Sequence, residues 1–298
     1  MGDEAMRRFR AYDHLQDWAG RLYRQALVQA PKDVALALAK TRDREKGLAR
    51  EIMELVVHNV ELAETNDTLI CQDTGLPIFW VKVGSGVALD LHRVVEAIRR
   101  GVEEATRRFA LRSSVCHPLS RHNPQTNTGL GVPVVHFDAL EGGDYIEIHA
   151  LPKGSGSENQ TFFAMLDPAQ GLTGIKQFVM ESVLRAGPKG CPPYVVGVGL
   201  GGSADLCMWL AKKALFRKVG EPHPDPEVAA LEKELLENIN QLGIGPQGLG
   251  GYTTAMAVHI EYAYTHISQN PVAINLQCWR GLRAAVRLYW DGREEVVV

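Results

Sequence analysis

The sequence is short of the features that mark several large classes of protein. Aromatic residues make up 7% of its 298 residues, and its five cysteines are an odd number. No run approaches the roughly 18 apolar residues of a membrane-spanning helix. The net charge of −3 provides no basic field for nucleic acid or for an anionic membrane surface. We therefore expect a protein that binds neither membranes nor nucleic acids.

The N-terminal stretch 1–29 is charged and carries no apolar core like that of a signal peptide. The five cysteines are widely spaced, and no two of them have the C-x-x-C spacing of zinc and redox sites. These two observations favour a reducing cytoplasm, in which the thiols are free or bound to metal rather than paired as disulfides.

Hydrophobic residues (45%) and charged residues (22%) occur at the levels of an ordinary globular protein. Helical and strand-like patterns alternate along the whole chain, with no low-complexity linker and no internal repeat. We predict an α+β (mixed α/β) fold in a single large domain over 1–298, with sheets covered by helices. Helices are expected at 12–30, 31–41, 43–63, 171–186, 204–217 and 226–242 and after Asp90, and strands at 78–83, 134–137, 145–150, 194–198, 253–262, 272–277 and 284–290.

One short loop concentrates reactive side chains. Cys71, Gln72, Asp73 and Thr74 follow one another between a helical pattern and the expected strand 78–83. A loop that is held between two regular elements is a common place for binding and catalytic groups. Asp73-Thr74-Gly75 is also the triplet of aspartic proteases, but no second copy supplies the other carboxylate. For Asp73 a functional carboxylate and a turn that caps its own backbone are both open.

The cysteines fall into two groups. Three lie at the ends of predicted elements, from which thiolates could point into one cleft and hold a metal or cluster with an open coordination position; they are Cys71, Cys191 and Cys278. Cys207 lies within a helical pattern among apolar neighbours and is predicted to be a core residue. Cys116 lies in the irregular polar stretch 111–132, and its role is open.

A glycine-rich turn offers a different function. Gly197 to Gly202 reads G-x-G-x-x-G between an expected strand and an expected helix, as in a dinucleotide-binding site. Such a site also requires a second strand with an acidic residue about 20 positions later. Here the proline-broken stretch 218–226 occupies that place. A tight turn, or a backbone site for a smaller anion, fits better than a dinucleotide-dependent oxidoreductase.

Several cationic or titratable side chains accompany these loops. Each by itself is more often a solvated surface charge, but together with Gln72 they would suit a small polycarboxylate; they are Arg112, His117, Arg121, Lys153 and His266.

Several motifs occur in the order seen in one family. They are Cys71-Gln72-Asp73-Thr74-Gly75, Arg112-Ser113-Ser114-Val115, Asn127-Thr128, the stretch 152–159, Cys191-Pro192-Pro193 with its glycine-rich turn, and Ile244-Gly245-Pro246-Gln247-Gly248. From about residue 45 to 285 the chain resembles the α subunit, or N-terminal domain, of class I (iron–sulfur) fumarate hydratases and the related tartrate dehydratases.

The resemblance implies a [4Fe–4S] cluster held by Cys71, Cys191 and Cys278, with one open iron acting as a Lewis acid. It implies that Gln72 and Asp73 contact the substrate, with Asp73 also handling a proton. By the same resemblance Arg112 binds a substrate carboxylate, Gly154 lets backbone approach the substrate, and His266 matches an active-site histidine.

The resemblance also implies a second module that this chain does not contain. A β subunit would complete the active site, in an α2β2 assembly acting on a C4 dicarboxylate. The segments 153–159 and 201–203 look closer to fumarate hydratases than to tartrate dehydratases. We therefore expect fumarate and (S)-malate as substrates, with a tartrate dehydratase α subunit as the alternative.

Overall fold

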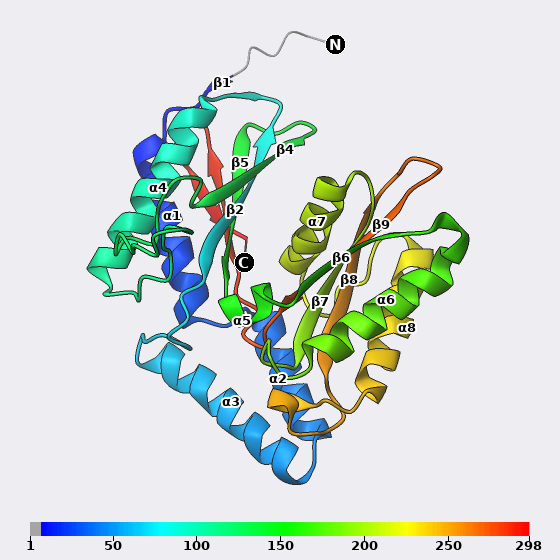
Figure 1. Cartoon of the computed structure of the whole chain (residues 1–298). Coiled ribbons are helices and arrows are strands. Elements are labelled where there is room, and N and C mark those ends of the chain that lie inside the picture. Colours follow the sequence, from blue (N-terminus) through cyan, green and yellow to red (C-terminus); the bar gives the residue numbers. More distant parts are fainter. Residues whose placement is uncertain (1–6, 298) are drawn as a thin grey trace. The chain divides into compact units, whose positions relative to one another are not determined.

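The computed structural model describes residues 7–297 and divides the chain into two compact units (Figure 1). Unit 1 contains 1–31, 66–153 and 282–298, and unit 2 contains 32–65 and 154–281. The sequence led us to expect one large domain. Each of the two units is assembled from segments that are not continuous in the sequence. The α+β class is confirmed, because helices cover mixed sheets in both units.

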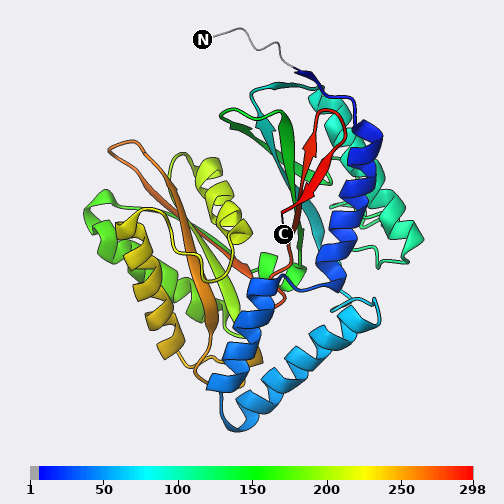
Figure 2. The same ribbon diagram turned by 180° about the vertical axis from the view of Figure 1, so that it is seen from behind.

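Unit 1 is built on a five-stranded sheet with the order β11-β10-β5-β2-β4. Only β2 and β4 are parallel within it. Helices α1 and α4 lie side by side on one face (Figures 1 and 2). The elements are β1 (Arg7–Arg8), α1 (Tyr12–Val28), β2 (Leu76–Gly84), β3 (Val87–Ala88), α4 (Leu91–Arg108), β4 (Val134–Leu140), β5 (Tyr145–Lys153), β10 (Ala284–Tyr289) and β11 (Glu294–Val296).

The two faces of the unit 1 sheet differ in chemistry because side chains alternate along each strand. Phe79, Val81, Ile146 and Ile148 join the apolar core beneath α1 and α4. The other face carries a charged cluster centred on Glu147, whose side chain is 8% exposed. Its carboxylate accepts hydrogen bonds from three side chains; these are His149 Nε2 at 2.7 Å, Lys82 Nζ at 2.8 Å and Arg287 Nε at 2.8 Å.

This cluster shifts the pKa of both titratable groups at its centre. The hydrogen bond from His149, together with those from Lys82 and Arg287, holds the pKa of Glu147 far below its ordinary value. Burial lowers the pKa of His149, since a charged imidazolium is costly away from water. At neutral pH the pair therefore consists of an ionised Glu147 carboxylate beside a neutral His149 imidazole.

Unit 2 is built on a four-stranded sheet with the order β6-β9-β7-β8, in which only β7 and β8 are parallel. Helices α6 and α8 pack on one face over an apolar core, and α7 packs on the other. The elements are α2 (Lys32–Arg44), α3 (Gly47–Thr65), α5 (Ser155–Glu158), β6 (Thr161–Leu166), α6 (Gly171–Ala186), β7 (Tyr194–Gly201), α7 (Ala204–Lys213), α8 (Pro226–Gln241), β8 (Ala255–Ala263) and β9 (Asn270–Gln277). Short 3-10 turns η1, η2 and η3 cover Pro168–Gln170, Ala214–Phe216 and Pro246–Gly248.

Local signals in the sequence explain where several helices begin and end. The Asp90 carboxylate accepts hydrogen bonds from the backbone N–H groups of His92 and Arg93, which caps α4. Asp225 caps α8 in the same way, with Pro226 at the first helical position. Gly187 ends α6. None of the helices in residues 7–297 is both long and apolar enough to cross a membrane.

Candidate functional site

The loop that contains Cys71 follows α3 in the chain and leads into β2, a strand of the unit 1 sheet. Its start is fixed by the backbone N–H of Ile70, which donates to the carbonyl of Leu27 at 3.0 Å. Asp73 Oδ1 accepts a hydrogen bond from the Gly75 N–H at 2.9 Å, so the turn in which Asp73 caps its own backbone is confirmed. Cys71 and Gln72 are both exposed.

Gly75 is required where this loop enters β2. Its φ is +69°, and a Cβ at this position would lie 2.7 Å from the backbone of Pro152 and Lys153. Only glycine has both the backbone freedom and the small size for this place. The close approach brings the loop of Asp73 against the end of β5, where Leu76 pairs with Lys153.

The same loop is tied to the segment that carries Arg112. Thr74 Oγ1 donates to the carbonyl of Arg112 at 2.6 Å, and the side chain of Asn127 donates to the same oxygen at 3.0 Å. Asn127 also accepts from the backbone N–H of Ser114 at 2.7 Å. Unit 1 thus brings together the predicted residues Cys71, Gln72, Asp73 and Arg112. The Arg112 guanidinium is exposed and makes no ion pair with any residue in 7–297.

Tyr23 is a supporting residue that the sequence analysis missed. Its side chain is buried in α1, and its hydroxyl donates to the carbonyl of Thr74 at 3.0 Å. Burial raises the pKa of this phenol, which therefore stays protonated and remains a donor. Nothing in the helical pattern of 12–30 distinguishes Tyr23 from an ordinary core aromatic.

Unit 2 brings Cys191 and Cys278 onto adjacent segments. The backbone N–H of Trp279 donates to the Cys191 carbonyl at 3.2 Å. Cys191 itself has a φ of +61°, an uncommon value for a residue with a side chain. The segment of Cys191 is held from both sides, because Gln247 donates twice to the carbonyl of Pro192 and Gly190 donates to the hydroxyl of Tyr194.

The loop that begins at Gly154 is docked on the strand that ends at Cys278. The buried Gly154 precedes α5, and its carbonyl accepts from Ser157 and Glu158. The Glu158 carboxylate accepts from Asn275 Nδ2 at 3.1 Å, and Asn275 lies three residues before Cys278 in β9. Three predicted site residues, Gly154, Cys191 and Cys278, therefore belong to one end of the unit 2 sheet.

His266 lies at the other end of that sheet. It is exposed in the connection between β8 and β9, and its neighbour Thr265 donates to the carbonyl of Gly202 at 3.0 Å. The eight residues of β9 separate this connection from Cys278, which corresponds to about 25 Å of extended chain. Unit 2 therefore does not group His266 with Cys278.

The glycine-rich sequence has a packing role in this fold. Gly197 and Gly199 lie within β7, and a Cβ on either would stand 2.1 Å from a backbone oxygen of α7. The glycines let α7 approach the sheet closely, so they are not the phosphate-binding loop of a dinucleotide site. Cys207 packs in this contact as the predicted core cysteine. Its Sγ lies 3.2 Å from the Gly199 carbonyl, and burial raises its thiol pKa to about 12.

We expect Gly199→Ala to lower the free energy of unfolding by about 2 kcal/mol, because the added methyl group must displace α7. Urea denaturation compared with Gly129→Ala would measure this. A Cβ on Gly129 would meet nothing closer than 3.9 Å, so this control should stay within about 0.5 kcal/mol of the wild type. A neutral Gly199→Ala, or saturable NAD binding by the wild type, would contradict the packing role.

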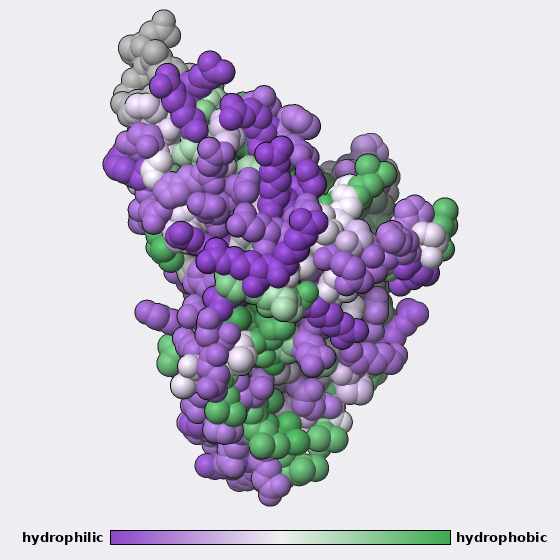
Figure 3. Space-filling view, turned by 90° about the vertical axis from the view of Figure 1, so that its left-hand side faces the viewer, coloured by the Kyte–Doolittle hydropathy of each residue, from purple (hydrophilic) through white to green (hydrophobic). Residues whose placement is uncertain are grey.

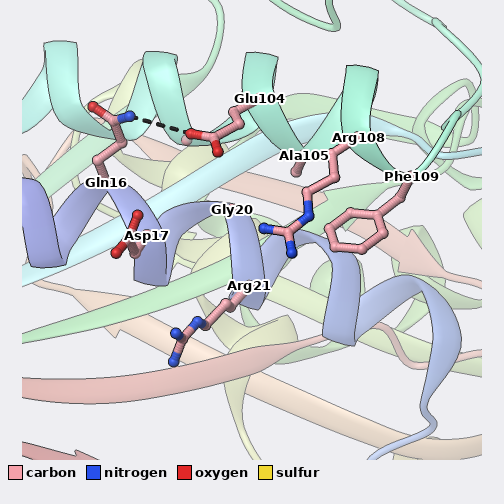
Figure 4. Close-up of a pocket in the computed structure, with 9 residues that line it drawn as sticks. Gln16, Asp17, Gly20, Arg21, Glu104, Ala105, Arg108 and Phe109 are labelled. Atoms are coloured by element: carbon pink, nitrogen blue, oxygen red, sulfur yellow. Dashed lines mark hydrogen bonds between the residues drawn. The ribbon is translucent and has the colours of Figure 1, made fainter.

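A hollow between α1 and α4 in unit 1 contains none of the predicted site residues. It encloses about 270 Å³ above the crossing of the two helices at Gly20 and Gly101. Figure 4 shows its rim of mixed charge, with Gln16 donating to Glu104 at 3.3 Å. Within residues 7–297 no group of three His, Cys, Asp or Glu side chains is placed to hold a metal ion, and Cys71 belongs to a different unit from Cys191 and Cys278.

Comparison with known proteins assigns the family. A family model described as fumarate hydratase (fumerase) matches residues 16–287. The chain belongs to the class I fumarate hydratase family. It is therefore a hydro-lyase of this family, as the motifs from Cys71 to Gly248 led us to expect.

Relatives that are similar in sequence to this chain are named as α subunits. A Methanocaldococcus jannaschii protein provisionally named L(+)-tartrate dehydratase subunit alpha is 45% identical over 94% of this chain and 99% of its own length. L(+)-tartrate dehydratase subunit alpha of Escherichia coli strain UTI89 is 37% identical over 89% of this chain and 87% of its own length. The K12 protein of the same name is 36% identical over the same shares.

Proposed function

We propose that the chain is the α subunit of a hydro-lyase that interconverts fumarate and (S)-malate. The observation that carries this proposal is the shared carbonyl of Arg112, which ties the segment of an exposed guanidinium to the loop of Cys71, Gln72 and Asp73. A cation, an amide and a carboxylate at one place suit a small diacid that must lose or gain a proton.

The cysteines are the residues that would hold a [4Fe–4S] cluster. Within residues 7–297 none of Cys71, Cys191 and Cys278 forms a disulfide bond, and Cys191 and Cys278 lie on adjacent segments of unit 2. Three thiolates are a suitable donor set for such a cluster with one open iron. When bound, a cluster of this kind supplies Lewis-acid polarisation of the C–O bond that is made or broken.

The side chains of the chain would then divide the remaining work. A bidentate contact from Arg112 to one carboxylate fixes the orientation of the diacid. The Gln72 amide can bind substrate oxygens, and the exposed position of both residues leaves them accessible. Asp73 would take or give the proton at the reacting hydroxyl, while Gly154 would present backbone without a side chain. We leave His266 outside this group because of its place at the far end of β9.

Tartrate dehydration is the second candidate, and the names of the relatives favour it. (S)-Malate and tartrate are both C4 dicarboxylates with a hydroxyl group on the carbon next to a carboxylate, so the same contacts would serve either. The names also support a partner β subunit, which we propose completes the site in an α2β2 assembly. A reducing cytoplasm would keep the three thiols available.

Anaerobic kinetics with the reconstituted chain and its β subunit would test this function. We expect kcat/KM for fumarate to exceed that for L(+)-tartrate by at least tenfold. The Asp73→Asn variant, prepared in the same way, should lose about 10²–10⁴-fold in kcat and so exclude a contaminating hydratase. Higher kcat/KM with tartrate would establish the second candidate, and no turnover of either acid would overturn both.

A further inference from the structure

A hollow in unit 2 lies between helix α2, the last turns of α8 and the start of strand β8. It encloses about 320 Å³, which is within the range of sites for small molecules. Apolar side chains from all three elements line it; they are Leu36, Ala37, Leu236, Ala255 and Met256. In contrast with the open hydrophobic surface in the lower part of Figure 3, the lining of this hollow also contains charged and hydroxyl groups. None of the residues predicted for the diacid or the cluster lines it.

One buried polar group in the lining lacks a partner. The side chain of Thr253 is 5% exposed, and its hydroxyl forms no hydrogen bond with any residue in 7–297. A buried hydroxyl without a partner costs folding free energy, so such a group calls for a molecule that completes it. The backbone beside it is fixed, because the N–H groups of Thr254 and Ala255 donate to Asn240 Oδ1 at 2.8 and 2.9 Å. The Thr253 hydroxyl is therefore held in place and available to a ligand.

Two cations of α2 line the same hollow. Lys40 and Arg44 are four residues apart, so their side chains are neighbours on one face of the helix. Both are exposed, and neither forms an ion pair with any residue in 7–297. They belong to the end of α2 nearest Thr253, because the backbone N–H of Tyr252 donates to the carboxylate of Glu45 at 2.9 Å. Glu45 itself is 1% exposed and does not line the hollow.

The acidic group of the lining lies at the opposite end of α2. Asp33 is in the first turn of the helix, seven residues before Lys40, which corresponds to about 10 Å along the helix axis. The Asp33 carboxylate accepts a hydrogen bond from the backbone N–H of Val219 at 2.6 Å. The hollow is therefore polarised, with its cations and its unpartnered hydroxyl at one end and its carboxylate at the other.

We propose that this hollow binds an organic phosphate, with the phosphate group at Lys40, Arg44 and Thr253. A guanidinium fork, an ammonium group and a hydroxyl together match the two charges and three free oxygens of a phosphate monoester. A carboxylate has one charge and two oxygens, so it would leave part of this set unused. The apolar walls provide contacts for the organic group that carries the phosphate.

Isothermal titration calorimetry of the full chain with phenyl phosphate would test the site, because this compound joins a phosphate to a small apolar ring. We expect saturable binding by the wild type. Binding to Lys40→Met, which loses the charge but keeps most of the side chain, should be at least about fivefold weaker. Lys46→Met is the matched control, since Lys46 is exposed just beyond α2 and outside the hollow, and this variant should bind like the wild type. No binding by the wild type, or equal affinity in the two variants, overturns the proposal.

Two further compounds test the chemistry of the ligand. Benzoate has the same ring with a carboxylate in place of the phosphate, and inorganic phosphate has no ring. We expect each to bind at least about tenfold more weakly than phenyl phosphate. Benzoate that binds as tightly as phenyl phosphate would overturn the assignment of a phosphate. Inorganic phosphate that binds as tightly would overturn the assignment of an organic group to the apolar walls.

Thr253→Val separates a binding role from a structural one. Valine has nearly the shape of threonine without the hydroxyl, so the variant removes the unpartnered group and opens no cavity. In the ligand-free chain we expect the midpoint of urea unfolding to be unchanged or higher than in the wild type. The affinity for phenyl phosphate should nevertheless fall about tenfold, the value of one hydrogen bond to a charged group. A lower midpoint with unchanged affinity would show that the hydroxyl stabilises the fold, and would overturn its place in the site.

Discussion

Serine at Cys191 or at Cys278 is expected to abolish iron binding and turnover together. The two residues lie on segments joined by the hydrogen bond from the Trp279 N–H to the Cys191 carbonyl, and in the proposed cluster site the loss of either thiolate would remove one of three ligands. A serine hydroxyl is a poor substitute, since it remains protonated and is harder than the sulfur ligands that iron–sulfur clusters use. Cys71→Ser should have the same effect if the third ligand comes from unit 1.

Iron and sulfide analysis after anaerobic reconstitution, with an optical spectrum, would measure this loss before any assay. The wild type should bind about four irons and four sulfides per chain, and each of the three variants should lose the charge-transfer band. Cys207→Ser is the matched control, because the Cys207 thiol is buried between α7 and β7 and should not contribute a ligand. Equal cluster content in all four variants would show that the ligand assignment is wrong.

Glu147→Gln is expected to lower the free energy of unfolding by about 3 kcal/mol, the cost of removing one partner from a buried ion pair. An amide cannot neutralise the partly buried Lys82 and Arg287, which both donate to this carboxylate. Urea denaturation at pH 7 would measure the loss. Glu96→Gln breaks an exposed helical pair with Arg99 and should cost less than 1 kcal/mol. If Glu147→Gln and Glu96→Gln lowered the free energy of unfolding by similarly small amounts, the cluster around Glu147 would not stabilise the fold as we expect.

The pH dependence of stability follows from the same cluster. Glu147 and His149 both have a pKa lowered by folding, so each contributes stability above its unfolded pKa and loses it as the pH falls. The His149 contribution should begin to fall below about pH 6.5, and that of Glu147 below about pH 4.3. Glu147→Gln should therefore flatten the loss of stability at the acidic end.

Regular elements with local signals were predictable from the sequence. The helix over Gly171–Ala186 has the predicted bounds. Asp90 and Asp225 cap the helices whose first turns they were predicted to cap. Strand β6 was missed; Thr161–Leu166 pairs only with β9, at the edge of the sheet, and comes directly after the short helix α5. The two compact units are assembled from segments that are far apart in sequence, so their make-up could not be predicted from local patterns.

The reactive side chains of the candidate site could be proposed from the sequence, whereas the residues that position them could not. Cys71, Asp73 and Arg112 have reactive side chains and stand in recognisable motifs. Tyr23 and Asn127 position that loop through backbone carbonyls, and this contribution has no sequence pattern of its own. Gly199 is the opposite case. Its motif suggested a dinucleotide ligand, whereas the atoms next to it belong to helix α7, which packs on strand β7.

The order of the chain has a consequence for synthesis. Strand β5 occupies the middle of the unit 1 sheet, and one of its two neighbours is β10, which begins only at Ala284. All of unit 2 has been translated by residue 281. During elongation β5 therefore keeps an unpaired edge, the kind of edge on which other chains can pair. Unit 1 can complete its sheet only after β10 and β11 have been translated.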